Sequence, residues 1–220
     1  ATPISKAEVA MDNSYELDTD PSVYVKFRLL PRGLKGKGQR AKENPVYLLA
    51  WTTTPWTLNS NTAIAVNKDL EYAEVDVDGT TLILAKKLLD KALTDEKHQV
   101  LPYDVIRTFK GSELVGLEYE PLLGDRRNEL EKHKDNVYKV WHADFVHDEE
   151  WTGIAHESPA YGEEDYVLAK QNKIPLVIDT DDEGFYTDGE WKGKQIWEVN
   201  KEIAKALHQR GDVWKIQYIQ

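Results

Sequence analysis

Two short stretches of the chain gather the residue types that could do chemistry. The first runs from Trp51 to Asn61 and places three consecutive threonines between two tryptophans, with Pro55 to fix the backbone. The apolar run 46–50 leads directly into it. This pattern predicts a buried strand that ends in a rigid, hydroxyl-lined corner, the kind of loop on which binding groups are commonly found.

The second stretch covers residues 151–166. It holds His156 in a short apolar segment, whose Gly153 predicts close packing against a neighbouring element, and then the start of an acidic helix that includes Asp165. We expect this stretch to form the second wall of one small hydrolytic pocket. Ordinary structural roles also fit, because carboxylates in a first helical turn complement the helix dipole, and a lone histidine is commonly just packed.

Such a pocket would contain hydroxyls, one amide, one imidazole and one or two carboxylates. A carboxylate can hold an α-ammonium group through a charge-assisted hydrogen bond. Threonine hydroxyls can orient a water or an ester carbonyl, and a histidine and a tryptophan can set the width of an apolar slot. The set favours binding an amino acid and aligning a water, with no covalent nucleophile and no metal.

Three other enzyme templates do not match the sequence. Ser158 lacks the flanking glycines of a serine-hydrolase elbow. No His-Glu-x-x-His motif is present, and the histidines form no helical pair that would bind zinc. The run Gly36-Lys37-Gly38 is too short to be a phosphate-binding loop.

Composition places the chain among ordinary globular proteins. Its 220 residues, 40% hydrophobic and 30% charged, suit one large domain or two small ones. The absence of cysteine excludes a disulfide framework. A net charge of −11 argues against a general nucleic-acid coat protein but leaves open a site that grips a few nucleotides. No stretch resembles a membrane span or a signal peptide, so we expect a cytoplasmic protein.

Most of the predicted elements are strands, and Asp78-Gly79 between two of them is a strong hairpin signal. We predict strands over 22–30, 46–51, 62–66, 72–77, 80–85, 104–109, 137–146, 152–156, 174–178 and 213–219, and helices over 86–93, from 162 and over 197–209. This order favours a mixed α/β, β-rich fold in a single domain over 1–220. We expect a closed or nearly closed β-barrel core decorated with helices.

Residues 31–44 are rich in glycine, lysine and arginine. This composition predicts a mobile, basic surface loop. In an acidic chain such a loop could touch a phosphate backbone, although an ordinary solvated loop is the commoner explanation.

The two stretches resemble the two signatures of the editing domain of isoleucyl-tRNA synthetase, a connective-peptide insertion in a class I aminoacyl-tRNA synthetase. The run 51–58, with Asn61 behind it, looks like the threonine-rich signature, and 152–166 resembles the second signature, which ends in Gly-x-x-Asp-Tyr. Residues 20–27 and 181–185 also match segments of the family, so the resemblance runs in order over most of the chain.

Details of the signatures refine the resemblance. The valyl and leucyl editing domains carry Thr-Thr-Arg-Pro followed by an acidic residue, whereas this chain has Thr54 and Trp56, which selects the isoleucyl branch. The chain departs from the family's usual proline near Asn59, and from its usual Thr or Ala at Glu157 and Ser158. These departures concern the local shape of the pocket.

The resemblance implies an aminoacyl-tRNA deacylase that hydrolyses valine mischarged on tRNA(Ile) and also contributes to clearing valyl-adenylate. One methylene separates isoleucine from valine, about 1–3 kcal/mol in an apolar pocket, so a second, size-selective sieve is needed. The implied partners are the 3′ end of tRNA(Ile) carrying valine, valyl-adenylate and the rest of the parent synthetase. The domain itself is expected to be a monomer without membrane contact.

Carried over residue by residue, the resemblance assigns Asp165 to the α-ammonium group of the substrate. Thr52, Thr53 and Thr54 line the site and help to position the water and the terminal ribose. Asp165, Thr53 and Thr54 are the implied catalytic residues. The attacking group is a water assisted by the adjacent ribose hydroxyl, so the domain needs no protein general base, metal or cofactor.

Three further residues complete the implied substrate-binding set. Trp56 shapes the side-chain slot, Asn61 supports the threonine corner, and His156 crowds the extra methyl group of isoleucine. ATP and Mg²⁺ belong to the parent enzyme only, because the chain lacks the two ATP-binding signatures of a synthetase. We expect an excised domain without aminoacylation activity.

Two alternatives stay open. The chain could be a module that docks the tRNA acceptor end without hydrolysis, in which case a non-hydrolysable valyl-adenosine analogue would bind without turnover of the ester. It could also be a valyl- or leucyl-type editing domain, which would prefer threonyl or norvalyl esters.

Overall fold

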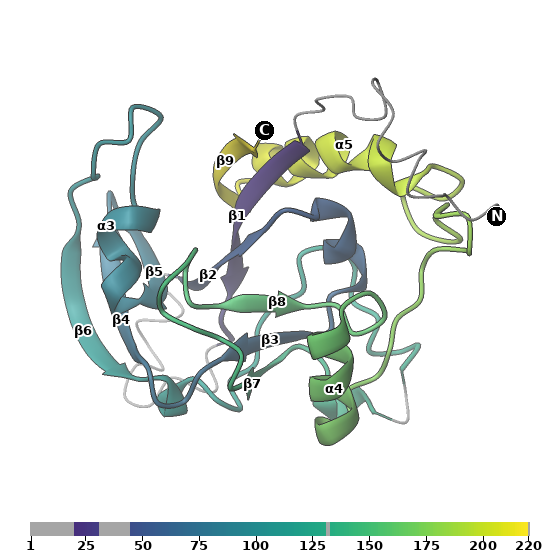
Figure 1. The fold of residues 1–220 in the computed structure, drawn as a ribbon, viewed down its shortest axis with the longest axis horizontal. Coiled ribbons are helices and arrows are strands. Elements are labelled where there is room, and N and C mark those ends of the chain that lie inside the picture. Colours follow the sequence, from purple (N-terminus) through teal and green to yellow (C-terminus); the bar gives the residue numbers. More distant parts are fainter. Residues whose placement is uncertain (1–19, 31–44, 131–132, 220) are drawn as a thin grey trace, which may run out of the picture.

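The computed structural model describes residues 20–30, 45–130 and 133–219. The predicted mobile loop 31–44 lies outside these described residues. Figure 1 shows the strands grouped into a larger and a smaller sheet, with one helix, α4, at the end of the smaller sheet and another, α5, beside β1 and β9.

Six strands form the larger sheet, in the order β6-β4-β5-β2-β1-β9. All neighbours are antiparallel except β2 and β5, which are parallel. The strands are β1 (Asp20–Arg28), β2 (Val46–Thr52), β4 (Glu71–Val77), β5 (Thr80–Ala85), β6 (Asp104–Lys110) and β9 (Val213–Ile219).

Local sequence explains the strands at the centre of this sheet. The apolar face predicted for β1 is fully buried, with Val23, Val25 and Phe27 in the core. Asp78 and Gly79 join β4 to β5 with φ values of 50° and 80°, as a two-residue hairpin turn requires. At the edge, β1 and β9 pair antiparallel along most of their length.

Three strands form the smaller sheet, in the order β7-β3-β8. They are β3 (Ala63–Val66), β7 (Lys139–His142) and β8 (Ala155–Glu157). β3 runs parallel to β7 and antiparallel to β8. The 3-10 helix η2 (Pro55–Ser60) connects β2 to β3, so the chain leaves the larger sheet at the threonines and enters the smaller one.

Helices lie at the three predicted positions, 86–93, from 162 and 197–209, and the structure adds short 3-10 helices elsewhere. The short ones are η3 (Lys86–Leu88), α3 (Leu89–Ala92), η4 (Gly111–Glu113) and η5 (Lys134–Asn136), and the long ones are α4 (Glu163–Asn172) and α5 (Ile196–Gln209). The buried side of α5 has helical spacing, with Val199, Ile203 and Leu207 in the core. None of the described helices has the length and apolarity that crossing a bilayer requires.

The predicted closed or nearly closed barrel is wrong. β6 and β9 are the two edges of the larger sheet, and within the described residues they do not pair with each other. The reason is that β3, β7 and β8, which could have helped to close the first sheet, pair among themselves as a second one. The fold is therefore mixed α/β and strand-rich, but open.

Three predicted strands also differ from the structure. The strand predicted at 152–156 is confined to Ala155–Glu157. Residues 174–178 pair with no strand in the described part of the chain, and Ile174 packs instead with Leu168 and Ala169 of α4. The predicted strand 137–146 pairs only over Lys139–His142. In the last two segments an apolar pattern reflects burial against other elements and not a ladder of strand hydrogen bonds.

Close packing at Gly153 is confirmed. Its φ is +68°, and a Cβ on it would lie 2.5 Å from the Cβ of Ala85 in β5. The backbone N–H of Ala85 also donates to the carbonyl of Thr152 at 2.8 Å. This approach anchors the segment before β8 to the larger sheet.

We expect Gly153→Ala to lower the free energy of unfolding by about 2–5 kcal/mol, since left-handed strain adds to steric overlap. Gly211→Ala is the matched control. Its φ is +79° and nothing lies within 4 Å of the added Cβ, so only the backbone strain of about 1–2 kcal/mol applies. Urea denaturation measures both, and equal losses would contradict the close packing.

Candidate active site

The threonine corner and the segment from β8 to α4 line one cleft of about 310 Å³. Its lining residues are Trp51, Thr52, Thr53, Thr54, Trp56, Thr57, Ala155, His156, Ser158, Tyr161, Gly162 and Asp165. The structure therefore brings together both predicted walls and every residue predicted to bind substrate except Asn61.

Asn61 is buried and does not line the cleft. Its Nδ2 donates to the carbonyl of Ala63 at 2.8 Å, and its Oδ1 accepts a hydrogen bond from the hydroxyl of Tyr119 at 2.7 Å. These bonds fix the backbone between η2 and β3. Asn61 is thus placed where it supports the threonine corner.

A chain of polar contacts connects the threonine hydroxyls to His156. Thr54 Oγ1 lies 3.2 Å from Oγ1 of both Thr52 and Thr57, and Thr57 Oγ1 lies 3.1 Å from His156 Nε2. The hydroxyl of Thr57 donates to the carbonyl of Thr54 at 2.8 Å. These contacts hold His156 Nε2 against the threonine corner.

His156 is a neutral imidazole in the folded protein. Burial lowers the pKa of His156 to about 4, against an opposing effect of the charge on Asp165. Its Nδ1 is buried and has no hydrogen-bond partner among the described residues. His156 contributes an uncharged ring to the cleft, and not a cation or an accessible base.

The first turn of α4 holds the Asp165 carboxylate in the cleft. Oδ2 of Asp165 accepts the backbone N–H of Ser158 at 2.7 Å. A Cβ on Gly162 would lie 2.5 Å from Oδ1, so glycine leaves the room that this carboxylate occupies. The helix start therefore positions Asp165 from two sides.

A second carboxyl group, Glu157, is buried next to Asp165. Glu157 is only 1% exposed, and its Oε2 has no hydrogen-bond partner among the described residues. The pKa of Glu157 is raised well above its usual range, mainly by burial. The charge of Asp165 and its hydrogen bond with Glu157 raise this pKa further. Because two adjacent carboxyl groups ionise together only at high cost, Glu157 is the protonated member of the pair.

Aromatic rings form the apolar end of the cleft. The rings of Trp56 and Tyr161 meet edge to face, with centroids 4.8 Å apart and planes at 70°. The backbone N–H of Trp56 donates to Oδ1 of Asn200 in α5 at 3.0 Å, and its carbonyl accepts from the hydroxyl of Tyr186 at 2.7 Å. Distant parts of the chain thus fix the width of this end.

The buried side chain of Asp179 ties Tyr161 to the threonine corner. Oδ1 of Asp179 accepts the hydroxyl proton of Tyr161, and Oδ2 accepts from Nδ2 of Asn59, both at 2.6 Å. Asn59 is one of the departures from the family pattern noted in the sequence. Its bond to Asp179 gives that departure a structural role.

Sequence reasoning missed Thr57, Tyr161 and Glu157 as site residues. Thr57 and Tyr161 lie within the two stretches, but spacing alone does not show that their side chains reach the cleft. Glu157 follows the predicted strand 152–156 and precedes Ser158-Pro159, so no local pattern showed that it would be buried. Among the described residues, no three His, Asp or Glu side chains are grouped so that they could hold a metal ion.

The sequence aligns with isoleucine–tRNA ligases over nearly its whole length. It is 37% identical over 216 residues to the isoleucine–tRNA ligase of Clostridium tetani, which covers 97% of the chain and 18% of that relative. This chain is a homologue of one segment of the isoleucine–tRNA ligases. The ligase of Pyrococcus furiosus is 39% identical over 212 residues, covering 93% of the chain and 19% of the relative. The chain thus spans less than a fifth of these curated relatives, and no protein-family model matches it.

Solved structures show the same fold in this isoleucine–tRNA ligase homologue and in leucyl-tRNA synthetases. GlLeuRS-CP1 has a TM-score of 0.67 at 15% identity, over 90% of this chain and 100% of that one. The P. knowlesi cytosolic leucyl-tRNA synthetase editing domain has a TM-score of 0.66 at 12% identity, over 96% and 100%. At these identities the likeness shows the fold alone, which is that of a synthetase editing domain.

We expect Glu157→Gln to change stability in a pH-dependent way. The pKa of Glu157 is raised above its usual value of 4.5 in the folded protein, so its stabilising contribution is complete below pH 4.5 and is lost as pH rises toward the folded pKa. Relative to the glutamine variant, the wild type should lose up to about 1.4 kcal/mol of unfolding free energy per pH unit in that window.

Denaturant titrations between pH 4.5 and 8 measure this difference, and the contribution of His156 cancels because both proteins keep it. Glu163→Gln, at an exposed carboxylate in the first turn of α4, controls for the loss of one surface charge. A difference between wild type and Glu157→Gln that stays constant over this range would show that Glu157 is ionised.

Proposed function

We propose that the chain is an aminoacyl-tRNA deacylase that hydrolyses the ester between valine and tRNA(Ile), with water as the nucleophile. The observation that carries the proposal is the composition of the joint cleft. One carboxylate, Asp165, shares it with the threonine hydroxyls and an uncharged histidine. The relation to isoleucine–tRNA ligases supports the choice of this tRNA and amino acid.

Asp165 is suited to the α-ammonium group of the substrate. Its carboxylate is already oriented by Ser158 and Gly162, so little ordering is needed when the ligand binds. A charge-assisted hydrogen bond is roughly twice as strong as one between neutral groups. Since Glu157 holds its proton, the single positive charge of the α-ammonium group would meet a single negative charge, that of Asp165.

In the proposed reaction, water attacks the ester carbonyl carbon and the acyl–oxygen bond breaks. A proton of the water passes to the departing ribose oxygen, with assistance from the adjacent ribose hydroxyl. Thr53 and Thr54 position the water and the carbonyl group. His156 is not the base, because its pKa is low and its Nδ1 is buried. The products are free valine and tRNA with an intact 3′ terminus.

Selection against isoleucine is assigned to the size of the apolar end. His156, Trp56 and Tyr161 line it, and their positions are fixed by hydrogen bonds and ring contacts. A rigid wall can reject one extra methylene through overlap, which a flexible wall would accommodate.

The same cleft contributes to clearing valyl-adenylate, which carries the same α-ammonium group. The domain itself uses no cofactor, and ATP and Mg²⁺ belong to aminoacylation by the parent enzyme. We place it in the cytoplasm, as a monomeric domain attached to the rest of that synthetase and in contact with the tRNA 3′ end.

The first test is single-turnover hydrolysis of Val-tRNA(Ile) by the wild-type chain and by Asp165→Asn. The variant keeps the shape and the acceptor for Ser158 but loses the charge, so we expect kcat/KM to fall about 100-fold. Glu163→Gln removes a nearby exposed carboxylate and should hydrolyse the ester at the wild-type rate. Equal wild-type rates on Val-tRNA(Ile) and Ile-tRNA(Ile) would refute the proposed function. Binding of a non-hydrolysable valyl-adenosine analogue by a chain that does not hydrolyse Val-tRNA(Ile) would refute it as well.

The second test concerns the sieve. His156→Ala enlarges the apolar end, so Ile-tRNA(Ile) should become a substrate and the preference for the valyl ester should fall about tenfold or more. His142→Ala removes a histidine of β7 that does not line the cleft and should leave the preference unchanged. If His156→Ala still cuts the valyl ester but not the isoleucyl ester, His156 is not part of the sieve.

A further inference from the structure

Trp151 has an unusual backbone and an unusual position. Its φ is 60°, although a bulky side chain strongly disfavours this left-handed region. Its indole stacks on that of Trp51, with centroids 3.4 Å apart and planes at 4°. Trp151 nevertheless remains 40% exposed. A residue that strains the backbone and leaves its ring exposed contributes little to the core, and such outliers concentrate at functional sites.

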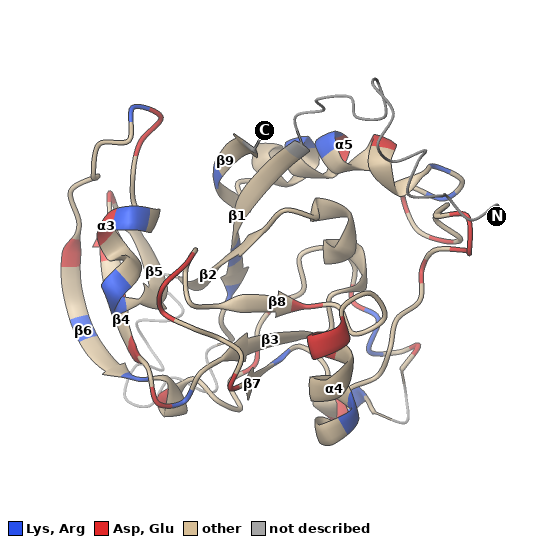
Figure 2. Ribbon diagram, viewed as in Figure 1, with Lys and Arg blue, Asp and Glu red and all other residues tan. Residues whose placement is uncertain are grey.

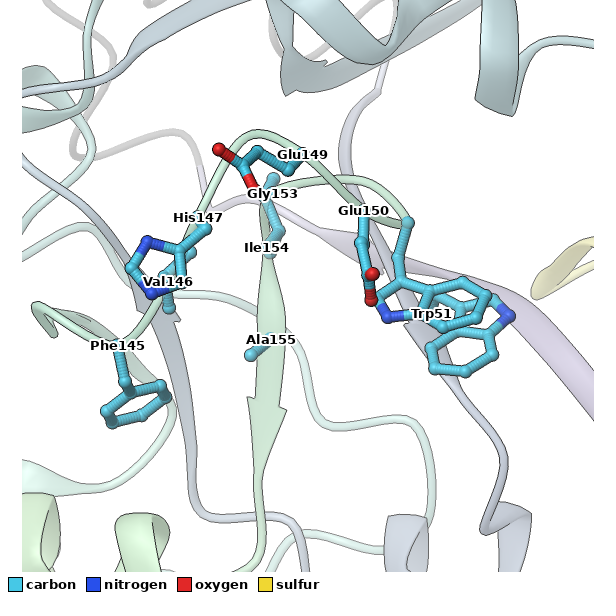
Figure 3. A pocket seen from close by; sticks show the side chains of 10 residues that line it. Trp51, Phe145, Val146, His147, Glu149, Glu150, Gly153, Ile154 and Ala155 are labelled. Carbon is cyan, nitrogen blue, oxygen red and sulfur yellow. The ribbon is translucent and has the colours of Figure 1, made fainter.

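The stacked pair borders a cavity of about 470 Å³ that adjoins the candidate active site. Both are lined by Trp51 and Ala155, and the remaining residues of the cavity come from 145–154. Figure 3 shows Phe145 and His147 on one side of the strand that carries Ala155, and Trp51 on the other. The volume lies in the usual range for small-ligand pockets. A ligand whose ester reaches the threonines could therefore extend into this cavity.

The charges around the cavity indicate which part of a nucleotide it would accept. Glu149 and Glu150 line it, and among the described residues no lysine or arginine does, although Lys91 Nζ donates to the carbonyl of Glu149 from outside the lining. Acidic residues cluster on the loop before β8 and at the start of α4 (Figure 2). A phosphate would be repelled here, whereas the exocyclic amino group of adenine or cytosine donates readily to a carboxylate. Flat aromatic rings also provide the stacking surface that unpaired bases use.

We propose that the Trp51–Trp151 pair is a stacking platform for an amino-bearing nucleobase at the single-stranded 3′ end of the substrate. This inference rests on the proposed function, because it takes the ester at the threonines as the fixed point. The strain at position 151 then has a use, since it presents the ring beside the site. The base is either that of the terminal nucleoside or that of the nucleotide before it.

The test is calorimetric titration of the full chain with adenosine 5′-monophosphate and with the trinucleotide CpCpA. Trp151→Gly removes the ring and relaxes the backbone, so we expect CpCpA to bind about tenfold more weakly while the protein is at least as stable as the wild type. Trp151→Phe should bind CpCpA with an affinity between those of the wild type and Trp151→Gly. Trp197→Ala, at an exposed tryptophan of α5, should bind like the wild type.

If Trp151→Gly binds both ligands more weakly, the terminal adenine stacks on the tryptophan pair. If it binds only CpCpA more weakly, the preceding cytosine stacks there. Unchanged binding of both ligands by Trp151→Gly, or an unfolded Trp151→Gly together with unchanged binding by Trp151→Phe, would overturn the platform. Hydrolysis of Val-tRNA(Ile) by the wild type is measured in parallel. If the wild type does not hydrolyse this ester, the proposed function is wrong. The titrations still test whether the Trp51–Trp151 pair binds a nucleobase.

Discussion

The pairing of β3 with β8 is the contact on which the site depends. It joins segments that are far apart in sequence and sets His156 opposite Ile64 and Glu157 opposite Ala63. Because side chains alternate across a strand, this register sends His156 to the cleft and Glu157 to the interior. A slip of one residue would exchange them and place a carboxyl group where the uncharged ring now lies.

Burial decides the charge of the cleft as much as residue type does. Low solvent access keeps His156 neutral and Glu157 protonated, so a cluster with three ionisable side chains carries its negative charge on Asp165. The threonine hydroxyls are in turn oriented by fixed acceptors, beginning with the carbonyl of Thr54. The result is a preorganised polar surface with one charge, which favours recognition of a small cationic group over metal or phosphate binding.

The strands and helices with clear periodicity, such as β1 and α5, were predictable from sequence because their local patterns match their burial. The open sheet was not, because local patterns do not tell which strands pair over long distances. The two signatures predicted that Asp165 and the threonines would lie close together, and they line one cleft. The roles of Thr57 and Asp179 depend on contacts between distant segments, so only the folded arrangement reveals them.

The pairing of β1 with β9 has a consequence for how this unit fits into a larger protein. Asp20 and Ile219 are register partners, so the chain enters and leaves the larger sheet at points about one strand spacing, 4.8 Å, apart. A host loop can accept a domain with such neighbouring ends at the entropic cost of a tight hairpin, without deforming its own structure.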